Sequence, residues 1–207
     1  MMKNSIDFLE IQDAEKNLFV GANQYWFKNK FHAISGCGPT TAAEILTYIA
    51  FKNKPALSHL YDYDINHLYK EDFVAYMTSV REFVKPGIKG LTDIDYFNHQ
   101  LISFAKGKGV ALSSKIIMAN EDKTRAFEEI KTAIDAGYPL AMLILRNPHD
   151  EIDEYTWHWM NIIGYDQSSL SIQISTYGKT HRLDFNKVWV SNPKYISEFV
   201  WFKPAGL

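Results

Sequence analysis

The sequence contains a single cysteine, Cys37, among its 207 residues. One cysteine cannot form a disulfide within the chain, so nothing implies an oxidising compartment. The chain also lacks the paired-cysteine and His-x-x-x-His spacings of zinc sites, and we therefore expect no metal ion. No stretch reaches the roughly 18 consecutive apolar residues that a membrane span needs, so we expect none.

The chain also lacks a large excess of either positive or negative charge. The 22 basic and 24 acidic residues are interleaved along the chain and leave a formal net charge of −2. Without a basic stripe, we expect no nucleic-acid partner. Gly87-x-x-Gly90 and Gly107-x-Gly109 lack the strand-to-helix context of a phosphate loop, so no cofactor is expected. Charge at Lys3 interrupts the N-terminus before an apolar signal segment can form, which predicts a cytoplasmic protein. Nothing in the sequence indicates the oligomeric state.

The composition is that of an ordinary globular protein, with 46% hydrophobic and 14% aromatic residues. The length predicts one domain covering residues 1–207. Apolar stripes at helical spacing lie within 73–84, 94–104 and 127–134, and we expect Thr92 and Asn120 to begin the last two helices. Expected strands cover 18–20, 110–118, 140–145, 157–165, 170–177, 181–184 and 198–203, and 185–189 is expected to form a short helix. Helices in about 36–136 followed by strands in about 139–203 predict an α+β fold, in which a helical N-terminal lobe packs on a C-terminal antiparallel sheet.

Cys37 lies where a helix is expected to begin. It stands in Ser35-Gly36-Cys37-Gly38-Pro39-Thr40-Thr41, and the apolar run from Ala42 to Ala50 follows. Proline suits a first helical turn, and a thiol there feels the positive end of the helix dipole, which favours the thiolate. The alternative is an inert, buried cysteine acting as a small hydrophobe. Glycine on both sides favours the reactive interpretation, because a cysteine that only fills space does not need it.

A second informative stretch places His158 between Trp157 and Trp159. Desolvation by the indoles would shift the pKa of this histidine, so it is either a base or thiolate partner, or a structural histidine in an aromatic core. The turn composition of Asp166–Ser169 predicts a hairpin that brings 175–178 opposite His158. Asp166 itself would lie roughly 26 Å away along the strand, at ~3.3 Å per residue, so it cannot orient the imidazole.

The Cys37-Gly38-Pro39 helix start and the segment from His158 to Asp166, about 120 residues later, together resemble the C39-like branch of the papain-like cysteine peptidases. The resemblance covers most of 20–203 and implies the papain-like fold. It implies that Cys37 is the nucleophile, that His158 is the general base, and that an upstream glutamine completes the oxyanion hole with the Cys37 backbone N–H. Apart from Gln12, Gln24 is the only upstream glutamine near enough, so it is our candidate, with Asn23 a weaker substitute. Gln24 lies 13 positions before Cys37, about twice the usual separation, so the intervening segment must bulge.

The third catalytic position departs from the family pattern. The family has Asp or Asn on the strand after the histidine, whereas this chain offers Ser175, followed by Thr176. A hydroxyl can accept from the imidazole but lacks the charge that stabilises an imidazolium, and Ser175 is our candidate. An acidic residue from the run 150–154 could fold back instead, although such a run is more typical of a solvated loop.

The resemblance therefore predicts a cysteine-dependent hydrolase that cleaves peptide or other amide bonds through an acyl-enzyme on Cys37. Its substrate would be a peptide or protein. One alternative is a catalytically impaired relative that binds a peptide or protein partner. Another is an acyltransferase, in which an amine captures the same thioester.

Overall fold

The computed structural model describes residues 4–190, 192 and 194–206. Its centre is a seven-stranded sheet in the order β5-β10-β6-β7-β8-β9, with β1 paired to β7. Every one of these strand pairs is antiparallel. The strands are β1 (Asn4–Ser5), β5 (Leu112–Ile117), β6 (Leu140–Arg146), β7 (His158–Asp166), β8 (Ser171–Thr176), β9 (Lys179–Asp184) and β10 (Ile196–Pro204). The antiparallel sheet expected in the C-terminal part is thus confirmed.

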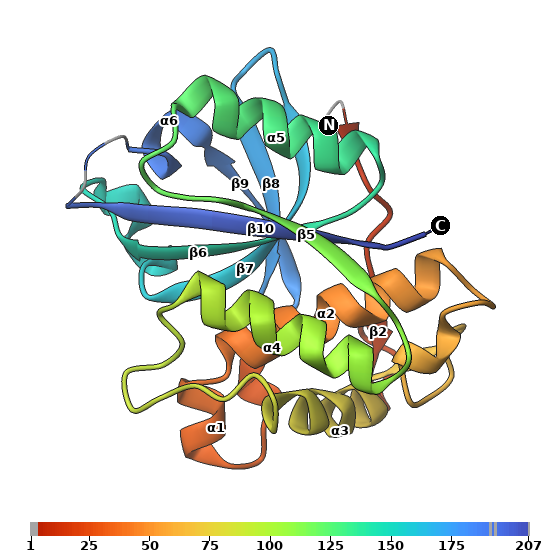
Figure 1. Ribbon diagram of the computed structural model, residues 1–207. Coiled ribbons are helices and arrows are strands. Elements are labelled where there is room, and N and C mark those ends of the chain that lie inside the picture. Colours follow the sequence, from red (N-terminus) through yellow and green to blue (C-terminus); the bar gives the residue numbers. More distant parts are fainter. Residues whose placement is uncertain (1–3, 191, 193, 207) are drawn as a thin grey trace.

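Helices cover both faces of this sheet (Figure 1). One group lies on the face that carries the N-terminal lobe: α1 (Lys30–Ile34), α2 (Cys37–Lys52), α3 (Lys70–Arg81) and α4 (Ile94–Gly107). The opposite face is covered by α5 (Lys123–Asp135) and α6 (Phe185–Val188). The residues that the structure describes also form three short 3₁₀ helices: η1 (Gln24–Trp26), η2 (Ser58–Leu60) and η3 (Asp150–Tyr155). The fold class is α+β, as predicted.

Strand alternation divides the interior into two cores. In β6, Ala141 and Leu143 pack with α2, α3 and α4, while Met142 and Ile144 pack with α5. The period of two explains this division, because successive side chains of a strand point to opposite faces. Every residue of α2 from Cys37 to Ala50 is buried. The apolar composition of that helix on all sides accounts for its central position.

A smaller sheet joins the N-terminal segment to the helical lobe. It has the order β3-β2-β4, with β2 (Glu10–Gln12), β3 (Leu18–Val20) and β4 (Leu68–Tyr69). The strand expected at 18–20 is present, but its pairing with β2 and the parallel pairing of β2 with β4 were not predicted. With three residues in β2 and two in β4, both strands are too short to produce a periodic pattern.

The helix starts differ from the predictions by one or two residues. The cap of α4 is Asp93 and not Thr92, because the Asp93 carboxylate accepts a hydrogen bond from the Tyr96 N–H at 2.9 Å. Likewise, α5 is capped by Asp122 and not Asn120, since the Asp122 carboxylate accepts from the N–H groups of Thr124 and Arg125. A carboxylate there also has the sign that the helix dipole favours.

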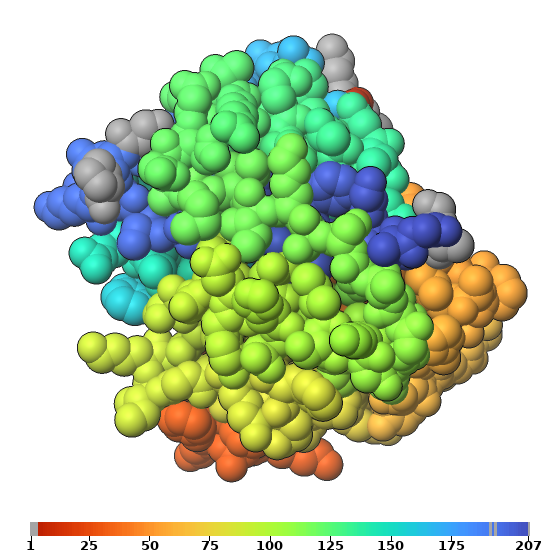
Figure 2. Space-filling view, viewed as in Figure 1, coloured from red at the N-terminus to blue at the C-terminus, as the bar shows by residue number. Residues whose placement is uncertain are grey.

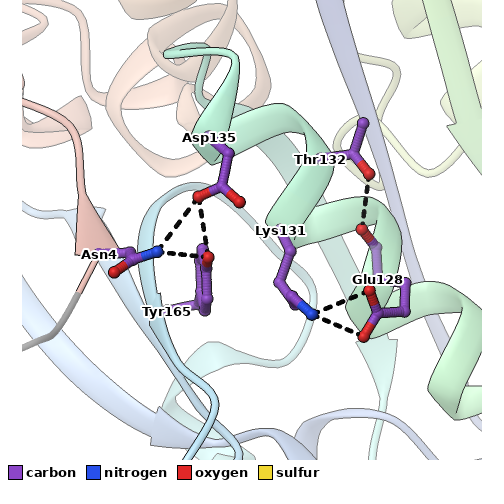
Figure 3. Close-up of polar contacts among 6 residues, drawn as sticks. All are labelled: Asn4, Glu128, Lys131, Thr132, Asp135 and Tyr165. Carbon is purple, nitrogen blue, oxygen red and sulfur yellow. Dashed lines mark hydrogen bonds and ion pairs between the residues drawn. The ribbon is translucent and has the colours of Figure 1, made fainter.

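Polar contacts join β1 to β7 and to α5 (Figure 3). The Asn4 side-chain amide donates to the Asp135 carboxylate at 3.2 Å and also to the Tyr165 hydroxyl, which in turn donates to Asp135 at 2.8 Å. On the same helix, Lys131 contacts both carboxylate oxygens of Glu128. The contacts among Asn4, Tyr165 and Asp135 hold β1 and β7 against the C-terminal end of α5.

On the face shown in Figure 2, side chains of the region from about 70 to 135 form most of the surface. Little of the C-terminal strand β10 is visible between them, which agrees with its buried side chains. Within the described part of the chain, no helix is both long enough and apolar enough to cross a membrane.

Candidate active site

Cys37 is the first residue of α2, and close packing surrounds it. Its side chain is buried, with 8% exposed. A Cβ added to Gly36 would stand 2.4 Å from the His32 carbonyl oxygen, and one added to Gly38 would stand 2.7 Å from Leu91 Cδ2. Glycine is therefore required on both sides, because neighbouring groups approach the backbone at the cysteine.

His158 begins β7 and is also buried, with 5% exposed. Its Nε2 lies 2.7 Å from Thr176 Oγ1. Its ring stacks on Tyr177, with centroids 4.7 Å apart and an interplanar angle of 14°. Burial lowers the pKa of His158 to about 4, so the imidazole is neutral at neutral pH.

The thiol is neutral for the same reason. Burial raises the pKa of Cys37, and this effect outweighs the opposing backbone N–H groups of Trp159, Gly38 and Cys37 itself. We expected the helix dipole to favour a thiolate, and His158 to be either a base or the partner of that thiolate. The structure favours a neutral thiol and a neutral imidazole lining one cavity, because desolvation penalises the charged form of both groups.

The imidazole partner is Thr176, which corrects the prediction of Ser175. The Ser175 hydroxyl instead donates to the Val20 carbonyl at 3.0 Å, and its cross-strand neighbour is Asn161. Two local features move the register: Asp166 pairs with Ser171, which lengthens the expected turn, and a bulge between Ile162 and Gly164 moves the pairing back by one residue.

Gln24 lies in η1, and the segment between it and Cys37 forms the bulge that the resemblance required. That segment was expected to be loop, but it contains α1, which is capped by the Asn29 side chain. Gln24 Nε2 donates to the Ala33 carbonyl of α1 at 2.8 Å, while its Oε1 has no hydrogen-bond partner among the described residues. An amide nitrogen carries two N–H groups, so one donor remains for a ligand.

The two weaker candidates have other roles. The Asn23 side chain caps η1 by accepting from the Tyr25 N–H and donates to the Tyr177 carbonyl at 3.2 Å. The acidic residues of η3, namely Asp150, Glu151, Asp153 and Glu154, are exposed. Of these, Glu151 pairs with Lys187. The solvated-loop interpretation of this run is therefore the one that the structure supports.

Two hollows meet at Cys37. The inner one is a cavity of about 10 Å³ whose walls include Gln24, Cys37, His158, Ser175 and Thr176. The outer one is a groove of about 260 Å³ that also includes Cys37. Its walls are mostly apolar: Phe31, Ile34, Ile88, Leu91, Leu145 and Trp157. Cys37 thus lines both a small, mostly polar cavity and a larger, mostly apolar groove.

Sequence reasoning missed two further polar residues of this interior, Glu44 and Asn161. Glu44 lines the inner cavity, and its carboxylate accepts from the Asn161 side-chain amide at 2.7 Å. The sequence nevertheless contains a signal for each of these two residues. Glu44 is the one charge in the run from Ala42 to Ala50, and Asn161 interrupts the apolar residues of β7.

The comparison with protein families finds a match that spans both motifs. The profile of the Peptidase_C39 like family matches residues 21–195, which include Gln24, Cys37 and His158. The chain belongs to this family. The resemblance to the C39-like branch of the papain-like cysteine peptidases is thereby confirmed for most of this C39-like chain.

Comparisons with curated proteins and with solved structures give less information about this C39-like chain. No curated protein matches it. Similar solved structures include the crystal structure of the Pseudomonas avirulence protein AvrPphB, with a TM-score of 0.37 and 10% sequence identity. That similarity covers 84% of this chain and 94% of the other.

Proposed function

We propose that this C39-like protein hydrolyses peptide or other amide bonds through an acyl-enzyme on Cys37, with His158 as the base. The observation that carries the proposal is that Gln24, Cys37 and His158, which come from η1, α2 and β7, line one cavity. A nucleophile, a base and an oxyanion donor are the three parts that thiol-dependent acyl transfer needs.

In this proposal the imidazole carries its proton on Nε2, which lies 2.7 Å from Thr176 Oγ1 and donates to it. The Nδ1 lone pair is then free to take the thiol proton. Because both groups start neutral, His158 acts as a general base during attack and does not hold a preformed thiolate.

The reaction then follows in two stages. Cys37 Sγ attacks the substrate carbonyl carbon while its proton passes to His158, and the oxyanion is stabilised by the Cys37 backbone N–H and the free Gln24 N–H. Collapse of this intermediate breaks the C–N bond, and the imidazolium gives its proton to the leaving amine. Water, deprotonated by His158, then attacks the thioester, and the thiol is regenerated with release of the acid.

The groove beside Cys37 indicates the kind of substrate. Its apolar walls include strongly exposed side chains, with Ile34 at 75% and Ile88 at 96%. Exposed apolar residues gathered in one hollow are typical of a binding surface. We therefore propose a peptide substrate with a large apolar side chain close to the scissile bond.

The test uses a set of fluorogenic peptides that carry Leu, Phe, Ser or Asp at the residue before the scissile bond. We expect turnover of the Leu and Phe peptides, none with Cys37→Ala, and a thioester of matching mass on the parent protein. Ile34→Ser should raise KM and also lower the rate of acylation, because it weakens the groove contacts that bring the substrate carbonyl to the sulfur. Turnover that persists in Cys37→Ala would overturn the proposal.

A non-catalytic binding role is the second candidate, and specific observations favour it. The inner cavity has a volume of only about 10 Å³, burial raises the pKa of Cys37, and the imidazole partner is a hydroxyl instead of a carboxylate. If the parent turns over no peptide while parent and Cys37→Ala bind a Leu or Phe peptide equally well, this role is the correct one.

Acyl transfer shares the thioester with hydrolysis. Adding glycine amide to the assay separates the two, because an acyltransferase forms the new amide in preference to the free acid.

A further inference from the structure

We propose that Glu44 is a positioning residue that holds the segments bearing Gln24, Cys37 and His158 in their catalytic arrangement. The proposal rests on the hydrolase function above and adds to it a residue that does not touch the substrate. Glu44 is 2% exposed and lies on α2, seven residues after Cys37. That separation is two helical turns, so both side chains lie on one side of the helix.

The two carboxylate oxygens of Glu44 have partners on two different segments. Oε1 accepts from the Ala22 backbone N–H at 2.5 Å, and Oε2 accepts from Asn161 Nδ2 at 2.7 Å. Ala22 precedes Gln24 by two residues, and Asn161 follows His158 by three on β7. One side chain therefore joins the oxyanion-hole segment and the histidine strand to the cysteine helix.

The backbone beside Glu44 is shaped for this contact. Gly21 has φ of +73°, and a Cβ there would stand 2.4 Å from Glu44 Oε1 and 2.3 Å from Ser175 Oγ. The Ser175 hydroxyl donates to the Val20 carbonyl at 3.0 Å. The segment before Gln24 is thus held by Glu44 from α2 and by Ser175 from β8.

We expect a neutral side chain of the same shape, such as glutamine, to make the same contacts as Glu44. Burial raises the pKa of this carboxyl to about 8, so the protonated form prevails at neutral pH. Glutamine can accept from the Ala22 N–H through its oxygen. Its amide nitrogen can donate to Asn161 Oδ1, which has no hydrogen-bond partner among the described residues, once the Asn161 amide turns over.

The test compares kcat and KM on an apolar fluorogenic peptide, and the rate of Cys37 carboxymethylation at neutral pH, for the parent, Glu44→Gln, Glu44→Ala and Asn161→Ala. Each protein is measured well below its own Tm, so that a loss of stability alone does not lower the rate. We expect Glu44→Ala to lower kcat at least about tenfold with KM within about threefold, since one misplaced oxyanion donor costs on the order of 100-fold. Carboxymethylation should slow at least about fivefold, because the thiol and the imidazole lose their alignment. Glu44→Gln should stay within about threefold of the parent in both.

Glu129→Ala is the matched control. Glu129 is also a buried carboxyl, but it lies on α5, accepts from Trp201 Nε1 at 2.8 Å and pairs with Lys115. This variant should have a lower Tm and an unchanged kcat and carboxymethylation rate.

The proposal is overturned if Glu44→Ala keeps both kcat and the carboxymethylation rate within about twofold of the parent, or if Glu44→Gln loses as much as Glu44→Ala. If Glu44→Ala does not fold, Asn161→Ala decides by the same criteria, because it removes only the connection to β7. If the parent turns over no peptide, the hydrolase function fails, and the carboxymethylation rates alone decide the role of Glu44.

Discussion

The buried imidazole of His158 predicts a loss of stability in acid. Burial lowers the pKa of His158 to about 4 in the folded protein, against an ordinary value of 6.5. Because the unfolded chain takes up the proton more readily, the contribution of His158 to stability falls as the pH falls below about 6.5, and this loss is complete below about pH 4.

The size of the effect follows from the two pKa values. Each unit of difference corresponds to about 1.4 kcal/mol, so the full loss is about 3 kcal/mol. Between about pH 7.5 and pH 5 the unfolding free energy should fall by about 2 kcal/mol from this residue alone. A buried group gains little from solvent screening, so most of this loss should be measurable.

The assay is urea unfolding at both pH values for the parent and for His158→Gln. Glutamine does not titrate, so the variant should lose about 2 kcal/mol less than the parent between these pH values, whatever its stability at neutral pH. His99→Gln is the control, because His99 is exposed on α4 and does not line either hollow at Cys37. The reasoning is refuted if His158→Gln loses as much stability as the parent.

Three further predictions concern Thr176, Glu44 and Gly21. Thr176→Val should lower kcat about tenfold with little change in KM, because a buried Nε2–H without its acceptor costs about 1–3 kcal/mol; an unchanged kcat on the peptide assay would contradict this. The parent should lose about 3 kcal/mol of unfolding free energy from Glu44 as the pH rises from about 5 to about 8, because its pKa rises from 4.5 to about 8 on folding, and Glu44→Gln should remove that loss in urea unfolding. Gly21→Ala should lower the unfolding free energy by at least about 2 kcal/mol, since φ is +73° and the new Cβ would overlap two side chains; an unchanged Tm would be evidence against this.

Local patterns predicted most of the elements. The strands after residue 139 and the helices at 94–107 and 123–135 come from strong periodicity and from nearby glycines and polar caps, which are local signals. Helix α1 escaped because five residues between Asn29 and Ser35 are too few to show a period. Its role is nevertheless consistent with the prediction, because it fills the long separation between Gln24 and Cys37.

The candidate site was predictable as a set of segments but not atom by atom. His158 and the segment 175–178 were expected to meet, and they do, through Thr176 and Tyr177. A bulge in β7 and a longer turn decided which hydroxyl reaches the imidazole, and neither has a clear sequence signature. The charge state was also beyond the sequence, because it depends on how completely neighbours exclude water from Cys37.

The burial of both reacting groups links the apolar groove to the chemistry. A neutral thiol and a neutral imidazole are the stable forms in this interior, so separating charge between them requires compensation. The oxyanion provides that compensation only when a substrate carbonyl lies against the Cys37 and Gln24 N–H groups, since its negative charge then faces donors and the new imidazolium. A small reagent that reaches the sulfur brings no carbonyl to these donors and has the help of the imidazole alone, whereas in the proposed mechanism a peptide in the groove beside Leu91 and Trp157 brings its carbonyl to the sulfur. Under the proposed hydrolase function, we therefore expect binding energy from the groove to activate the buried cysteine, and selectivity for apolar side chains to be expressed in the rate of acylation as much as in affinity.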